Sequence, residues 1–224
     1  MRRFLRDNSL SLVFLGLFLA ALVFQAVAGH RVFNEDQVSH GGPEISFGRF
    51  VLSSEFATAV MENWQSEYLQ FTLFILLTVW LIQRGSPESK EPGKAGRESD
   101  EDQRVGEHAR RNSPRWAKLT RLPRTLYENS LLIVMGVIWI ASWYAQSVTG
   151  VTAFNAERLS HHEDRVSWAT YVGTSDFWEK TLQNWQSEFL AVGSMAVLAI
   201  YLRQRGSPES KPVGAPHEAT GVEG

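Results

Sequence analysis

The sequence contains no cysteine among its 224 residues. This absence excludes disulfide bonds, zinc sites with thiolate ligands, iron–sulfur clusters and cysteine nucleophiles. The sequence also lacks a phosphate-binding glycine-rich loop, a nucleophile elbow and a helical pair of zinc-binding histidines. Its Lys and Arg residues are not interleaved with exposed aromatic residues on one folded face, which is the pattern of nucleic-acid-binding surfaces. We therefore expect a protein that is not an enzyme, needs no cofactor and binds no nucleic acid.

Apolar and polar residues are strongly segregated along the chain, although the formal net charge is only −2. Two apolar runs, at 10–28 and 131–148, have the length of transmembrane helices. Two shorter apolar runs reach that length only when Trp64 and Trp185 and the residues after them are included. The sequence therefore predicts four membrane helices, at about residues 10–29, 64–83, 131–150 and 185–204.

Two words of sequence each occur twice, at one fixed offset. The segment NWQSEYLQ, at 63–70, is repeated as NWQSEFLA at 184–191. The segment QRGSPESK, at 83–90, is repeated unchanged at 204–211. The same offset aligns residues 5–90 with 126–211 without a gap. Self-similarity at a fixed offset indicates a tandem duplication.

The repeated words lie where the second helix of each copy would enter and leave a membrane. Trp64 and Trp185 suit the outer interface, where aromatic belts occur, and Arg84 and Arg205 suit the inner one. In QRGSPESK the arginine suits a helix end, the glycine the position after it, and Ser-Pro-Glu a new turn. We interpret the words as boundary and anchor signals rather than as partner-binding motifs.

The Lys and Arg residues are concentrated before the first predicted span, in residues 84–124 and after the last span. The positive-inside rule then places both termini and the central segment in the cytoplasm. We expect an all-α membrane protein whose four transmembrane helices form two tandem hairpins, a parallel internal repeat with pseudo-two-fold symmetry. The repeat units are 1–90 and 121–211, joined by a disordered charged cytoplasmic linker, 91–120, and followed by a disordered tail, 212–224.

Two features near the predicted spans add detail. The N-terminal arginines, the apolar run and a small-residue site ending at Ala28 are also typical of a cleavable signal peptide, whose removal would leave three spans. We favour a retained span, because the internal copy of this region keeps the same polar residues. Residues 54–61 and 175–182 each begin with serine and are predicted to extend the second spans outward as helix.

Polar residues gather near the outer end of the predicted spans. Asn63 and Glu67 are four residues apart and share a helix face, as do Asn184 and Glu188. The predicted cluster consists of Gln25, Asn63, Gln65, Glu67, Gln146, Asn184, Gln186 and Glu188. Such residues either hold helix ends together by hydrogen bonds or form a vestibule for a cation or proton. The position at the membrane edge favours the structural interpretation.

The outer loops contain histidines close to acidic residues. His40, His161, His162 and Glu163, together with the glutamates of the cluster, would be the ligands of any metal site. No helical spacing of His and Glu supports such a site, so we expect exposed loop histidines.

The segments NSL…QAVAG, ENWQSEYLQ and QRGSPESK resemble a family of uncharacterised bacterial multi-pass membrane proteins, classed as a domain of unknown function. The resemblance covers roughly residues 1–90 and 121–211. It implies a location in the bacterial plasma membrane, and it carries over no catalytic or binding residue.

Three functions follow from these features, in order of preference. The first is a non-enzymatic scaffold or interaction protein whose partners are the lipid bilayer and a further copy of itself or another membrane protein. The second is a small unit for ion or solute permeation with Glu67 and Glu188 in its pathway. The third is a metal-dependent membrane enzyme that uses the loop histidines.

Overall fold

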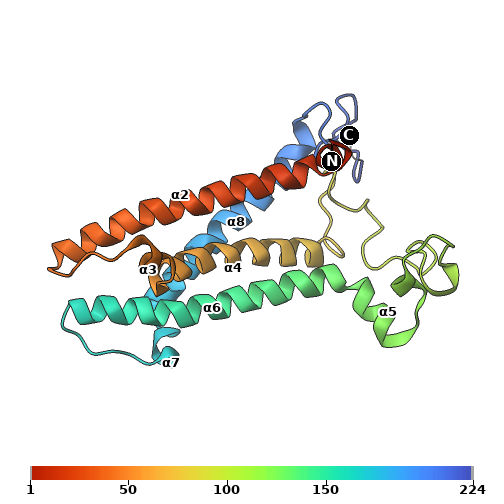
Figure 1. Cartoon of the computed structure of the whole chain (residues 1–224). Coiled ribbons are helices and arrows are strands. Elements are labelled where there is room, and N and C mark those ends of the chain that lie inside the picture. The colour runs from red at the N-terminus through yellow and green to blue at the C-terminus, as the bar shows by residue number, and fades with distance from the viewer. Residues whose placement is uncertain (1, 223–224) are drawn as a thin grey trace. The chain divides into compact units, whose positions relative to one another are not determined.

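The computed structural model describes residues 2–222, which contain helices and no strand (Figure 1). The α-helices are α1 (Arg2–Asp7), α2 (Ser9–Ser39), α3 (Phe47–Val51), α4 (Ser54–Leu77), α5 (Arg121–Glu128), α6 (Ser130–Ser160), α7 (Trp168–Tyr171) and α8 (Ser175–Tyr201). Two 3-10 helices, η1 (Gly106–His108) and η2 (Arg115–Lys118), lie between α4 and α5. The all-helical prediction is confirmed for the described residues.

The chain forms two compact units. The first comprises Met1–Met61 and Ala145–Phe177, and the second comprises Glu62–Tyr144 and Trp178–Gly224. The long helices α4, α6 and α8 each contribute residues to both units.

Two helices in the described part of the chain, α2 and α6, are long and apolar enough to cross a membrane. The sequence predicted four. α4 and α8 do not reach the same mean hydropathy, because polar and acidic residues such as Glu62 and Glu67 occupy their first halves. The two helices also end at Leu77 and Tyr201, before the predicted inner boundaries.

The starts of α4 and α8 match the sequence prediction. Both helices begin at the expected serines, Ser54 and Ser175. The hydroxyl oxygens of Ser53 and Thr174, one residue earlier, accept hydrogen bonds of 3.3 Å from the backbone N–H groups of Phe56 and Phe177. These bonds satisfy N–H groups that lack a partner within the helix.

In the first unit, one asparagine on α2 and one on α6 each close the loop that follows the helix. The Asn34 Oδ1 accepts a hydrogen bond of 2.9 Å from the Ile45 N–H, and its Nδ2 donates to the Ile45 carbonyl at 3.1 Å. Asn155 makes the same pair of bonds with Val166, at 2.8 and 2.9 Å. A side-chain amide thus pairs with the backbone as a neighbouring strand would, and fixes the return of the chain toward α3 or α7.

An aromatic ring covers a glycine on α2, and another ring covers a glycine on α6. A methyl group added to Gly29 would lie 3.0 Å from the Phe50 ring, and one added to Gly150 would lie 3.0 Å from the Tyr171 ring. Tyr171 is fully buried and packs against Phe154 and Phe177, with ring centroids 5.2 and 5.5 Å away. Because glycine has no side chain, the ring packs directly on the helix backbone.

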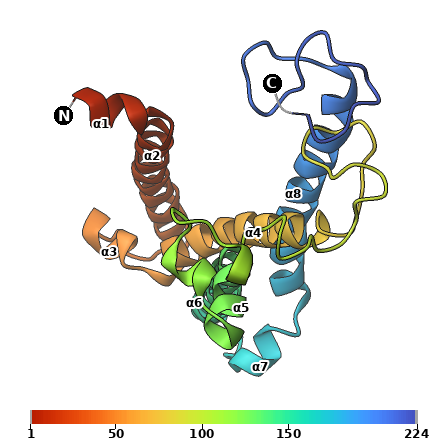
Figure 2. The ribbon, with the colours of Figure 1, turned by 90° about the vertical axis from the view of Figure 1, so that its right-hand side faces the viewer.

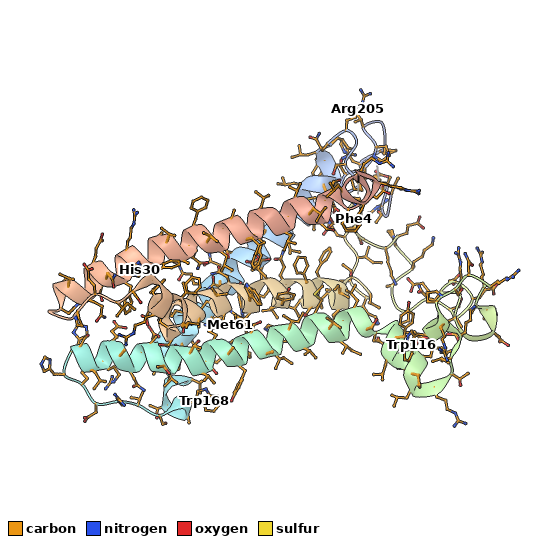
Figure 3. The ribbon with its side chains drawn as sticks, in the orientation of Figure 1. Phe4, His30, Met61, Trp116, Trp168 and Arg205 are labelled. Carbon is orange, nitrogen blue, oxygen red and sulfur yellow. The ribbon has the colours of Figure 1, made fainter. Side chains whose placement is uncertain are left out.

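A side chain of the segment between α6 and α8 also contacts α6. Trp168 lies on α7 (Figure 3), and its indole N–H donates a hydrogen bond of 2.9 Å to the Ser147 hydroxyl on α6. This bond and the two hydrogen bonds between Asn155 and Val166 hold the segment between α6 and α8 in place.

In the second unit, the chain after α4 and the chain after α8 lie together (Figure 2). The Gly85 N–H donates to the Thr220 hydroxyl oxygen at 2.8 Å, and the Gly221 N–H donates to the Ser86 carbonyl at 3.0 Å. The described residues of the predicted linker form turns and the two 3-10 helices, and those of the predicted tail, through 222, form turns. The disorder predicted for both segments stays a prediction.

Candidate functional site

The predicted polar cluster is partly brought together where α4 and α8 meet in the second unit. The Gln65 side chain is fully buried, and its Oε1 accepts a hydrogen bond of 2.7 Å from the Trp185 indole N–H. The Glu188 carboxylate lies within hydrogen-bonding reach of the Ser66 hydroxyl and close enough to the Glu67 carboxylate for electrostatic interaction. The two glutamates at equivalent positions of the repeated word are therefore neighbours.

Other members of the predicted cluster lie apart from these contacts. Asn184 Nδ2 donates to the Lys180 carbonyl of its own helix at 2.7 Å, and the Asn63 and Gln186 side chains are exposed. Gln25 and Gln146 belong to the first unit, Gln25 exposed and Gln146 fully buried. Among the described residues, neither end of the Gln146 amide has a hydrogen-bond partner.

The predicted boundary residues Trp64, Trp185, Arg84 and Arg205 lie in different environments. Trp64 is exposed, and Trp185 packs on Trp143 with ring centroids 5.6 Å apart. Arg84 and Arg205 are both exposed, and the Arg84 guanidinium lies 3.7 Å from the Glu218 carboxylate. Arg205 lies beyond the end of α8 (Figure 3).

The loop histidines form no metal centre in the described part of the chain. The rings of His40 and His161 lie 5.9 Å apart in an edge-to-face arrangement. No group of three His, Asp or Glu side chains with ligand geometry occurs in residues 2–222. Glu163 instead pairs with Arg158 at 2.8 Å, and His162 occupies a turn with a φ of 62°.

The two copies of QRGSPESK fold into the same closed loop. The Gln83 N–H donates to the Ser89 hydroxyl oxygen at 2.9 Å, and the Gln204 N–H donates to that of Ser210 at 2.9 Å. The glycine in each loop has a φ between 83 and 89°, a conformation that favours glycine. The hydroxyl oxygen of a serine six residues further along the chain thus accepts a hydrogen bond from the glutamine N–H. In a continuing helix this N–H would donate to a backbone carbonyl instead. The sequence predicted a turn here, but not this closed loop.

The two loops meet through equivalent glutamates. The Glu88 carboxyl is hydrogen-bonded to the Glu209 carboxyl. Burial raises the pKa of the Glu88 carboxyl above its ordinary value, and the Glu209 hydrogen bond and negative charge raise it further. Two carboxyl groups in contact favour a state that retains a proton.

Lys211 is the buried cation of this region, with a side chain only 1% exposed. Its ammonium donates to the Gly85 carbonyl at 2.6 Å, the His217 carbonyl at 2.8 Å and the Ala219 carbonyl at 3.1 Å. Burial and the nearby Arg203 lower the pKa of this lysine. The equivalent Lys90 is less buried, and its ammonium donates to the Gly96 carbonyl at 2.6 Å. The sequence gave no sign of this difference, because it depends on residues outside the repeated words.

Comparison with the curated proteins and with the solved structures found no match. The contacts described above therefore have no counterpart of known role on which a function could be transferred. One family model, "Domain of unknown function (DUF6766)", matches residues 1–222, and the chain belongs to that family.

Proposed function

We propose that this chain is an integral plasma-membrane protein of a bacterium, with four membrane crossings in two tandem hairpins and both termini in the cytoplasm. In this proposal α2, α4, α6 and α8 make the crossings, and the chain acts as a non-enzymatic scaffold that binds the bilayer and another membrane protein or a second copy of itself. The carrying observation is the exposure of the apolar helices. Leu10, Phe14 and Phe24 on α2 are 72, 64 and 73% exposed. Apolar surface of this extent needs an apolar environment to cover it.

α6 supports the same proposal. Leu131, Val137 and Ile140 are 58, 61 and 59% exposed. A helix buried in the core of a soluble protein would present few such residues, whereas only 17% of the most apolar window of α6 is buried.

The crossings by α4 and α8 rest on their second halves. Phe71 and Leu77 on α4, and Leu190 and Leu198 on α8, are exposed apolar residues. The polar residues in the first halves of these helices would face water or the opposite helix near the outer membrane surface. The loops after α4 and α8 have the same hydrogen bond, which favours the two helices ending at the same depth in the membrane.

Transport is the second candidate, and the neighbouring carboxylates of Glu67 and Glu188 favour it. Two acidic groups at the edge of a bundle are a ligand set for a cation. Against this function, Gln65 and Trp185 next to them are joined by a direct hydrogen bond, as in a packed helix junction. The scaffold function is therefore preferred.

The membrane proposal is tested by extraction with alkaline carbonate, which releases peripheral proteins and leaves integral ones in the membrane. We expect the whole chain to remain in the membrane fraction. Release into the soluble fraction would contradict the proposal.

The choice between scaffold and transport is tested with single cysteines, because the chain has none of its own. Glu67→Cys and Glu188→Cys are treated in intact cells with a membrane-impermeant maleimide, with His40→Cys as the exposed-loop control. A scaffold is expected to show slow labelling at Glu188, which is partly buried, and no effect of added cations. Rapid labelling at both positions that cations block would establish transport instead.

A further inference from the structure

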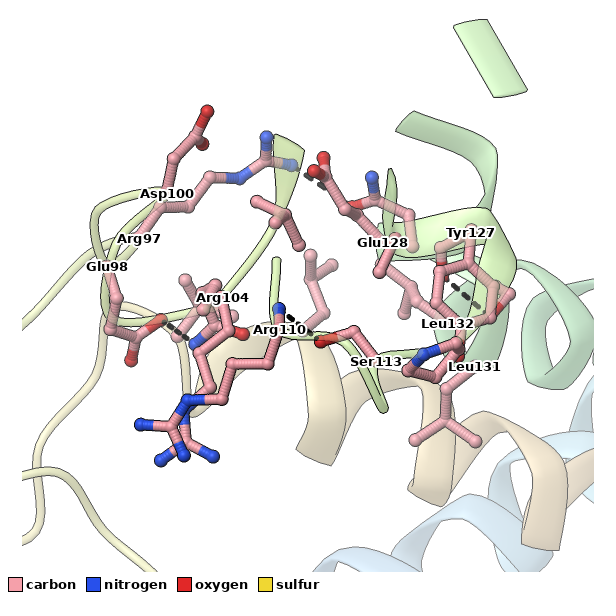
Figure 4. A pocket seen from close by; sticks show the side chains of 18 of the residues that line it. Arg97, Glu98, Asp100, Arg104, Arg110, Ser113, Tyr127, Glu128, Leu131 and Leu132 are labelled. Atoms are coloured by element: carbon pink, nitrogen blue, oxygen red, sulfur yellow. Dashed lines mark hydrogen bonds between the residues drawn. The ribbon is translucent and has the colours of Figure 1, made fainter. Parts of the chain in front are cut away.

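A cavity of about 810 Å³ lies in the second unit between the end of α4, the start of α6 and the segment that joins them (Figure 4). Its walls have two different characters. One part consists of charged residues from the joining segment, and the other consists of apolar residues where the two long helices end or begin. The cavity is separate from the cluster of Gln65, Glu67 and Glu188, none of which lines it.

The charged wall has an excess of positive charge once its ion pairs are counted. Glu98 is paired with Lys90, and both Asp100 and Glu128 are paired with Arg124 at 3.1 Å. All three acidic residues of the wall therefore have a basic partner.

Three arginines of the wall have no such partner. Arg97, Arg104 and Arg110 make no ion pair with any carboxylate in residues 2–222. Arg97 donates a hydrogen bond of 3.1 Å to the neutral Asn129 side chain, which orients its guanidinium without neutralising it. Guanidinium groups in this situation are suited to a phosphate, whose oxygens accept their N–H donors in pairs.

The apolar wall is formed by the ends of helices that the membrane proposal places at the inner membrane surface. Leu76 lies in the last turn of α4, Val79 and Trp80 follow it, and Leu131 and Leu132 lie in the first turn of α6. Trp80 and Leu131 are 51 and 58% exposed. An inorganic phosphate would leave this wall uncovered, whereas an amphiphile would place its hydrocarbon part there.

We propose that this cavity binds the phosphate of an anionic phospholipid, with Arg104 and Arg110 at the headgroup and the apolar wall along the first part of the acyl chains. The inference rests on the proposed membrane insertion, because lipid reaches the cavity from the cytoplasmic leaflet. It assigns a role to the charged segment between the two repeat units, which would be fixed against the membrane surface when lipid is bound.

The test measures binding of short-chain phosphatidylglycerol to the full chain in a neutral detergent by isothermal titration calorimetry. Short-chain phosphatidylcholine and inorganic phosphate are the comparison ligands. The variant is Arg104→Gln with Arg110→Gln. The matched control is Arg111→Gln with Arg115→Gln, which removes the same charge from the same segment but does not touch the cavity. Circular dichroism verifies that both variants keep the helical content.

We expect the cavity variant to bind phosphatidylglycerol about 25-fold more weakly, since each of the two arginines near an anionic headgroup contributes roughly a factor of five. The control variant is expected to change the affinity less than about twofold. Phosphatidylcholine and inorganic phosphate are expected to bind at least about tenfold more weakly than phosphatidylglycerol. A second variant, Trp80→Ser, is expected to weaken the lipid but not inorganic phosphate.

Equal losses in the cavity and control variants would overturn the proposal, because they would mean unspecific attraction to the basic segment. Equal affinity for inorganic phosphate and phosphatidylglycerol would also overturn it, since the site would then recognise the free anion. Carbonate extraction of the same proteins separates the two proposals. A chain that stays in the membrane but fails to bind the lipid contradicts this inference alone, and a chain that leaves the membrane contradicts the proposed function.

Discussion

The ammonium group of Lys211 links the loop after α8 to the loop after α4 and to the last described residues. Replacement by methionine keeps most of the unbranched side chain but removes the ammonium donor from the Gly85, His217 and Ala219 carbonyls. Buried acceptors left without a donor cost about 2 kcal/mol, which corresponds to about 30-fold in an opening equilibrium. We expect Lys211→Met to accelerate amide hydrogen exchange at Gly85 and Gly221 by about that factor.

Lys90 provides the matched control for this substitution, because it occupies the equivalent position of the repeated word. Its ammonium contacts Gly96 and Glu98 rather than the C-terminal residues. Lys90→Met is therefore expected to leave exchange at Gly221 unchanged. Equal acceleration by both substitutions would show that the two lysines have the same role.

The contact between Glu88 and Glu209 makes the junction of the two loops sensitive to pH. The pKa of the Glu88 carboxyl is raised above its ordinary value of 4.5, first by burial and then by Glu209. The folded junction consequently binds more protons than the open one. Its extra stability is fully present below the ordinary pKa and is lost as the pH rises through the raised pKa. We expect protection of the Gly221 amide, corrected for intrinsic exchange, to fall as the pH rises above the ordinary pKa of 4.5.

Glu88→Gln removes the ionisation and keeps a hydrogen-bonding side chain. This variant is expected to protect the Gly221 amide equally across the range, at a level near that of the unmodified chain in acid. Glu91→Gln is the control, since Glu91 is exposed and pairs with Lys94 at 2.7 Å. A pH dependence that persists in Glu88→Gln would mean that another group titrates at the junction.

At the scale of the helices, the packing of α6 depends on a glycine. A methyl group at Gly150 would lie 2.5 Å from the Tyr171 hydroxyl oxygen and 3.0 Å from its ring, and the fully buried Tyr171 has no space to withdraw. Gly150→Ala is expected to destabilise the fold by about 1–3 kcal/mol through overpacking. Thermal unfolding in detergent, followed by circular dichroism, should show a lower midpoint.

Gly136 lies in the same helix and serves as the control. Its added methyl group would meet only Thr72, at an ordinary contact distance of 3.8 Å. Gly136→Ala is expected to leave the midpoint unchanged or raise it, because alanine favours helix by up to about 1 kcal/mol over glycine. A higher midpoint for Gly150→Ala as well would mean that the ring does not press on the helix.

Helix starts could be predicted from the sequence more reliably than helix ends. Ser54 and Ser175 were expected as first residues, and a polar cap just before each of them gives the local reason. The predicted first span ends at Gly29, but α2 continues to Ser39. Glycine did not end the helix, since its role is to admit the Phe50 ring. This role depends on a residue far along the chain, which hydrophobic periodicity does not reveal.

The same limit applies to the whole molecule. The repeated words indicated two equivalent positions for Glu67 and Glu188, and the two side chains are neighbours in the second unit. The hydrogen bond between Gln65 and Trp185 joins residues at non-equivalent positions of those words. No pattern within one copy specifies such a bond, because it depends on how the two copies pack.

The number of membrane crossings is the property of the whole molecule that decides the proposed function. Four crossings place His40 and His162 outside and Ala95 in the cytoplasm. If only α2 and α6 crossed, the chain between them would stay on one side, so that His40 and Ala95 would share a side and His162 would lie opposite. We expect four, because the Lys and Arg residues between 84 and 124 resist transfer to the outside.

Single cysteines at these three exposed positions distinguish the two arrangements. In intact cells an impermeant maleimide is expected to label His40→Cys and His162→Cys, and to label Ala95→Cys only after permeabilisation. Labelling of Ala95→Cys together with His40→Cys, and protection of His162→Cys, would establish two crossings. In that case α4 and α8 would lie at the membrane surface. The cavity lined by Arg97, Arg104 and Arg110 would then face the outer leaflet, so this experiment also fixes the leaflet from which a lipid enters it.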